Sequence, residues 1–238
     1  MRLTGAGREF YEDTVQLLAI RERALTRKPA PTPRNTLRIS CRSDASTMVL
    51  GHACERCAEL YPEVEQVIVP LRSEVQLEAI ASGRADVTEW PQSTSVGNYG
   101  LSFRSLVESP HVCVVRRQHP LAQAKTVSLT DLEGIAVTML DRGRCCNADR
   151  LRDLIERDYP GIRLPPSQFD ASQRLVGTAN GLAIVMPRVF AEGNLDENRV
   201  MRPLDVNMRM SVGLVYRAEK PSEALGKFLD AAEKAFEE

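Results

Sequence analysis

Hydroxyl side chains occur at three places where a predicted strand gives way to a predicted helix. Ser43, Ser46 and Thr47 follow the first strand, Ser73 begins a later helix, and Ser172 follows a strand predicted near residues 164–170. The free amides and the positive dipole end of a helix start can bind an anion. The same hydroxyls also serve as ordinary N-caps, so each position is either a ligand contact or a cap.

A loop rich in arginine and cysteine follows Thr138, at the end of another predicted strand. Arg142 and Arg144 each carry a guanidinium that can hold a carboxylate through two hydrogen bonds, and Arg144 is the preferred anion clamp. A thiolate at the adjacent Cys145 or Cys146 would be acidified by these charges, which is the property that oxidation chemistry requires. The loop therefore predicts an anion contact, with redox sensing as the alternative.

The tryptophan and one pair of cysteines can each be interpreted either as a functional site or as part of the core. Trp90, the only tryptophan, follows the third predicted strand and could stack on a planar ligand, although a core position is the commoner one. Cys54 and Cys57 have the spacing of a metal or redox pair, but they lie inside a predicted helix without a second pair. We expect the two cysteines to pack in the core and expect neither a metal nor a cofactor.

The histidines give no indication of catalysis. His52, His111 and His119 have no neighbouring nucleophile and orienting group that would complete a catalytic triad. We therefore expect a binding protein and not an enzyme.

Composition narrows the class of protein further. The 238 residues carry 31 lysines and arginines against 32 acidic residues, so the chain itself has no basic field for DNA or anionic lipid. No apolar run reaches the roughly 18 residues of a membrane helix, and residues 1–7 lack the apolar stretch of a signal peptide. We expect a cytoplasmic protein without membrane contact, with its six cysteines reduced.

The pattern of apolar residues and prolines predicts three segments. Residues 1–28 contain helical spacings and form a linker and dimerisation helix, since an isolated amphipathic helix needs a partner for its apolar face. Residues 29–35 form a proline-rich linker, because proline cannot continue a helix. Residues 36–238 form the globular domain.

Alternating strands and helices predict two α/β lobes in the globular domain. Lobe I takes residues 36–110 and 206–238, and lobe II takes residues 111–205. Two such lobes joined by crossing strands describe the periplasmic-binding-protein-like fold, in which a ligand lies in the cleft between the lobes.

Several short motifs occur in the order and spacing of one known family. They are Leu3-Thr4-Gly5-Ala6-Gly7-Arg8-Glu9-Phe10, Leu37-Arg38-Ile39, Tyr61-Pro62-Glu63-Val64, Ala81-Ser82-Gly83-Arg84-Ala85-Asp86 and His119-Pro120-Leu121-Ala122. With these motifs the chain resembles the LysR-type transcriptional regulators over nearly its whole length. It departs from them at Arg42, where alanine or glycine is usual, and at Asn180-Gly181-Leu182-Ala183, which matches the family's G-x-G-I only loosely.

The resemblance implies an effector-sensing regulatory domain that binds a small anionic molecule between its lobes and relays it through the linker helix. It also implies a homodimer or homotetramer, effector contacts at the turn of Ser43, Ser46 and Thr47, and DNA binding through a winged helix-turn-helix head that would precede Leu3.

The loop at Cys145 resembles the L-E-D-G-H-C segment of the family's peroxide-sensing branch. The resolving cysteine of that branch corresponds to Leu154 here, so redox sensing would have to use adjacent Cys145 and Cys146. A solute-binding protein is the other alternative, and the missing signal peptide argues against it.

Overall fold

The computed structural model describes residues 14, 35–42, 48–140, 142–143, 145–165, 181–192, 195–219 and 221–237. The chain divides into two units, residues 1–33 and 34–238, and the second unit holds all of the elements below. In the first unit only Thr14 is described, and it is helical. The predicted linker helix otherwise lies outside the described residues, as does most of the proline-rich linker.

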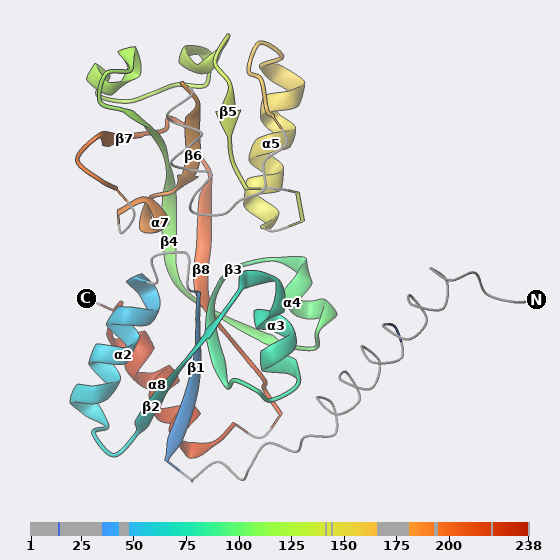
Figure 1. The fold of residues 1–238 in the computed structure, drawn as a ribbon, viewed down its shortest axis with the longest axis vertical. Helices are drawn as coiled ribbons and strands as arrows, with labels where there is room; N and C mark the ends of the chain where they lie inside the picture. The colour runs from blue at the N-terminus through green and yellow to red at the C-terminus, as the bar shows by residue number, and fades with distance from the viewer. Residues whose placement is uncertain are drawn as a thin grey trace, which may run out of the picture. The chain divides into compact units, whose positions relative to one another are not determined.

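Lobe I is built on a parallel three-stranded arrangement (Figure 1). Strand β1 (Thr36–Arg42) lies between β2 (Glu65–Leu71) and β3 (Val87–Pro91), so Ile39 is paired with both Ile68 and Val87. Helices α2 (Met48–Leu60) and α3 (Ser73–Ala81) connect the strands. The predicted βαβαβ order is confirmed.

Apolar side chains from both ends of the chain form the core of lobe I. Leu37 and Ile39 of β1 are fully buried and pack with Leu50 of α2 and Phe228 of α8 (Glu223–Lys234). The C-terminal helix therefore returns to the first lobe. Ser222 caps this helix by accepting a hydrogen bond from the Leu225 amide, at 3.1 Å.

Two long strands carry the sheet from one lobe to the other (Figure 1). Strand β8 (Arg209–Tyr216) is antiparallel to β3 and to the first part of β4 (Ser102–Arg116). The rest of β4 pairs with β6 (Ala183–Pro187) and β7 (Arg199–Pro203). These crossings are the covalent connection between the lobes.

Lobe II covers its strands with α5 (Cys146–Asp158), the short helix α7 (Arg188–Glu192) and two 3-10 turns, Pro120–Gln123 and Thr130–Leu132. Strand β5 (Val137–Thr138) is parallel to β6. Leu151 and Ile155 of α5 are fully buried against these strands.

The elements differ from the predictions at several points. Strand β4 begins ten residues before Val112, and α4 (Thr94–Asn98), α7 and β7 are additional. Trp90 and Pro91 lie inside β3, not after it. Of the strand expected near residues 164–170, only residues 164–165 are described, and they are not in a strand, while an isolated bridge joins Ala136 to Arg163 just before them.

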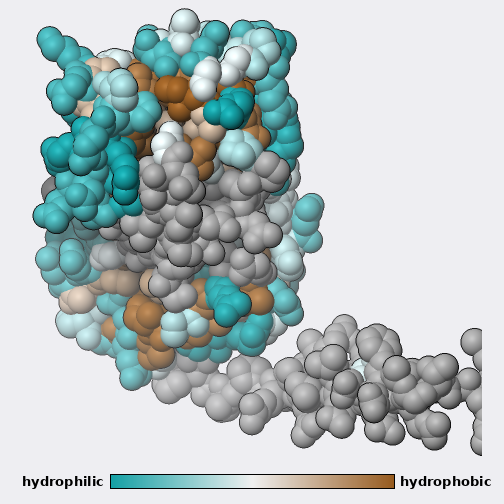
Figure 2. All heavy atoms as spheres, turned by 45° about the horizontal axis from the view of Figure 1, so that its top comes forward, coloured by the Kyte–Doolittle hydropathy of each residue, from teal (hydrophilic) through white to brown (hydrophobic). Residues whose placement is uncertain are grey.

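The polarity of the surface and the length of the helices are typical of a packed α/β domain. On the face drawn in Figure 2, hydrophilic side chains predominate along the flanks and hydrophobic groups form patches between them. No helix within the described ranges combines the length and the apolar character needed to cross a bilayer.

Candidate functional site

The two lobes meet in a cluster of apolar side chains beside the crossing strands. Val49 of α2 packs there with Cys145 and Ala148 at the start of α5, and with Val189 of α7 and Met210 of β8. All five are at least nine-tenths buried. Residues at the starts of two helices, one from each lobe, therefore belong to the same apolar cluster.

Three hydrogen bonds reinforce this junction. The Cys146 amide donates to the Gln92 carbonyl at 3.4 Å, just after β3. The Asn147 side-chain amide donates to the Arg209 carbonyl at 2.6 Å. The Val189 amide donates to the Ser109 hydroxyl at 3.0 Å. All three bonds join residues of lobe II to residues of lobe I.

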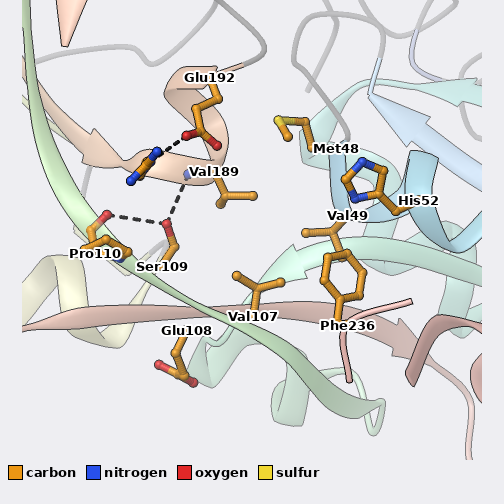
Figure 3. Close-up of a pocket in the computed structure, with 11 residues that line it drawn as sticks. Met48, Val49, His52, Val107, Glu108, Ser109, Pro110, Val189, Glu192 and Phe236 are labelled. Atoms are coloured by element: carbon orange, nitrogen blue, oxygen red, sulfur yellow. Dashed lines mark hydrogen bonds and ion pairs between the residues drawn. The ribbon is translucent and has the colours of Figure 1, made fainter. Parts of the chain in front are cut away.

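A pocket of about 250 Å³ opens at the same junction (Figure 3). Its walls come from α2, the crossing part of β4, α7 and the C-terminal Phe236. The His52 and Phe236 rings lie 5.8 Å apart at an interplanar angle of 41°, and the Arg188–Glu192 ion pair is also at the pocket. Such a lining suits a small apolar or aromatic group with a polar end.

The start of α2 already holds an anion from within the protein. The Glu89 carboxylate, on β3, accepts a hydrogen bond from the Leu50 amide at 2.9 Å, and Glu89 is only 7% exposed. A carboxylate at this position is favoured by the free amides and the dipole of the helix. The sequence analysis missed Glu89; the signal that could have found it is an acidic residue within a buried strand.

Lobe II contains a second residue that the sequence analysis missed. Arg152 of α5 is 8% exposed, and its Nη2 donates to the Leu140 carbonyl at 3.1 Å, just beyond β5. Its Nε is buried without a hydrogen-bond partner. In the sequence Arg152 is one of several charged residues of a predicted helix, and the pattern does not indicate that it is buried.

The structure describes three of the predicted ligand contacts, and each of the three lies in a different part of the domain. Trp90 is 6% exposed and packs with Leu77 and Val215, while its Nε1 donates to Ser93 at 3.3 Å, so its indole belongs to the core. Thr138 is buried at the end of β5. The backbone of Ser73 begins α3.

The other predicted contacts lie outside the described residues. These are Ser43, Ser46, Thr47, Arg144 and Ser172. Their assignment to an effector site stays a prediction.

The redox alternative would need an acidified thiol at Cys145, whereas the described surroundings of Cys145 favour the neutral thiol. It is 1% exposed, and burial raises its pKa above the ordinary value, while hydrogen bonds from the Ala148 and Asn147 amides lower it by less. The charge of Arg142 is engaged elsewhere, in ion pairs with Asp153 at 2.7 Å and Glu156 at 2.6 Å. Cys146 is half-buried at the first turn of α5.

The Cys54 and Cys57 pair packs against the core of lobe I. Cys57 is fully buried, and burial is the main reason why the pKa of Cys54 rises to about 12 and that of Cys57 to about 11. The described part of the chain contains no group of three or more side chains suited to a metal ion.

One family model and several solved structures match this chain. The family described as LysR substrate binding domain matches residues 30–237. Full-length CbnR complexed with its target DNA superposes with a TM-score of 0.66 at 18% identity, over 99% of this chain and 82% of CbnR.

Two OxyR structures are also similar. The oxidized form of OxyR gives a TM-score of 0.65 at 18% identity, over 84% of this chain and 95% of OxyR. A sulfate-bound mutant regulatory domain of OxyR2 from Vibrio vulnificus gives a TM-score of 0.65 at 19% identity, over 87% of this chain and 100% of the OxyR2 chain. None of the curated proteins matches. Likenesses at these identities show the fold, which is periplasmic-binding-protein-like, and the match over residues 30–237 shows that the chain belongs to the LysR substrate-binding-domain family.

Proposed function

We propose that this chain senses a small-molecule effector for a LysR-type transcriptional regulator and is not an enzyme. The effector binds where the lobes meet and changes their relative orientation, and the linker helix relays the change. The observation that carries the proposal is the junction itself, where Val49 of α2 and Ala148 of α5 belong to one apolar cluster and three hydrogen bonds join α5 and α7 to lobe I. A ligand can shift such a contact only if it binds the two orientations with different affinity.

The proposal includes partners. A homodimer or homotetramer would form through the linker helix and the regulatory domain. DNA would be bound by a winged helix-turn-helix head, in the cytoplasm. The complex of CbnR with its target DNA supports a DNA-directed output for this fold.

The redox alternative has less support. The match to OxyR leaves it open, but the buried Cys145 thiol with its raised pKa is poorly suited to reaction with an oxidant.

A metabolite panel tests the sensing function directly. Thermal shift and calorimetry on the purified chain should identify a ligand, and the same ligand should change transcription from the regulator's promoter in cells. A control variant, Arg56→Ala, removes an exposed ion pair on the outer side of α2 and should leave both responses intact. Absence of any ligand across a broad panel, together with an unresponsive promoter, would refute sensing.

A further inference from the structure

Arg152 is a nearly buried cation whose charge no carboxylate balances within the described part of the chain. Its one hydrogen bond goes to the Leu140 carbonyl, and its Nε is buried without a partner. Burying a guanidinium without a counterion costs several kcal/mol, so buried arginines are normally paired with an acid. Within the residues that the structure describes, the surroundings of Arg152 are therefore incomplete.

The acidic residues of α5 are already engaged by other groups. Asp149 accepts the Gly143 amide at 3.1 Å. Asp153 and Glu156 pair with Arg142, and Asp158 pairs with Arg157. Arg150 of the same helix bonds Asn147 at 3.4 Å and is exposed, so Arg152 is the buried arginine of α5, and no acidic residue of the helix pairs with it.

The guanidinium of Arg152 lies where a side chain that binds a ligand is expected. Side chains of a helix lean toward its N-terminus, and the bond to Leu140 places this one just past the carboxyl end of β5. Ligands of parallel α/β sheets bind at the carboxyl ends of the strands. Arg152 is also one helical turn beyond Ala148, which packs in the junction between the lobes.

In lobe I, the start of α2 is next to a negative charge, that of Glu89, whereas α5 of lobe II carries the positive charge of Arg152. Glu89 holds the Leu50 amide there, so an anion arriving at α2 would meet a buried carboxylate. An anionic ligand is therefore directed away from the α2 start and toward lobe II.

We propose that Arg152 binds the anionic group of the effector, a carboxylate or another small oxyanion. This inference rests on the proposed sensing function and names the ligand class of that site. The bound anion supplies the missing counter-charge and receives hydrogen bonds from the guanidinium.

Sulfate is the probe for a first test, in thermal unfolding of the full chain against chloride of equal ionic strength. Wild type should gain about 3 °C in Tm at tenfold saturation. Arg152→Met should lose this gain and, without sulfate, melt no lower than wild type, because an unbalanced buried charge is removed. Arg150→Met is the matched control, because Arg150 is exposed on the same helix. This variant should keep the full gain in Tm, and it also controls for the general stabilising effect of sulfate on proteins.

Two results overturn the assignment. One is a sulfate gain in Arg152→Met equal to that of wild type; the other is no gain in wild type at all. If Arg152→Met does not fold, Arg152→Lys decides, since it keeps the charge but loses the planar fork, and its gain should fall to less than half.

Sensing and this assignment can fail separately. A metabolite that binds wild type should bind Arg152→Met at least tenfold more weakly. Equal affinity refutes the role of Arg152 and leaves sensing intact. A sulfate gain that depends on Arg152, without any metabolite that changes the promoter response, supports an anion site at Arg152 but refutes sensing, and with it the assignment of that site to an effector.

Discussion

Burial sets the chemistry of single residues in this domain more than sequence neighbours do. Cys145 stands beside two arginines in the sequence, yet the structure gives it a protected thiol with a raised pKa. Glu89 and Arg152 look like ordinary charged residues in the sequence, yet both are more than nine-tenths buried. Their contacts reach across elements, such as the 39 residues between Glu89 and Leu50, and local patterns cannot show that.

The protected state of Cys145 can be measured by alkylation. Iodoacetamide should label Cys145 of the folded protein far more slowly than Cys146, because only the exposed thiolate reacts and Cys145 is 1% exposed. Mass spectrometry after timed quenching gives both rates, and the unfolded protein in guanidinium provides the reference. Labelling of Cys145 as fast as in the unfolded chain would favour the redox alternative instead.

His111 should make the domain less stable in mild acid. Burial lowers its pKa, and its Nδ1 lies 3.1 Å from the Met208 carbonyl, so the folded protein holds the neutral ring. The unfolded state then binds more protons, and the free energy of unfolding falls as pH drops below about 6.5. Urea titrations over that range should show a weaker pH slope in His111→Gln. His52→Gln is the control, and equal slopes in all three proteins would contradict this role.

At the scale of elements, the sequence predicted those whose apolar pattern is regular and local. Leu37 and Ile39 alternate along β1, and the parallel order of β1, β2 and β3 followed from the strand and helix repeat. The first half of β4 was missed because Ser102 and Ser105 interrupt its apolar pattern. Its strand conformation comes from pairing with β8, more than 100 residues later in the chain.

That pairing depends on a glycine. A Cβ at Gly213 of β8 would lie 1.8 Å from the Arg104 carbonyl oxygen of β4, so the two strands would have to separate. Gly213→Ala should lower the free energy of unfolding by about 3 kcal/mol or more in urea titrations. Gly226→Ala is a matched control, because Gly226 lies in α8 with open space around it and alanine there should stabilise by up to about 1 kcal/mol. Equal effects of the two substitutions would show that the close approach is not important.

At the scale of the whole domain, the described residues form a separate core in each lobe and an apolar junction between them, and the sheet runs through both lobes along β4 and β8. The cores around Phe228 and Leu151 do not include the junction residues Val49 and Ala148. We expect a ligand at the junction to change the orientation of the lobes while each core stays folded, which a sensor requires.

Ala148→Glu tests this separation, because it places a charge among Val49, Val189 and Met210. Burying that carboxylate is unfavourable, so the junction should open while both cores remain intact. Hydrogen exchange should then become faster at the start of α2 and in the first residues of β8, and stay unchanged around Phe228 and Leu151. Ala58→Glu, on the exposed face of α2, should alter neither region. Uniformly faster exchange in Ala148→Glu would mean that the two lobes unfold as one body, and a sensor that works by reorienting them would then need a different hinge.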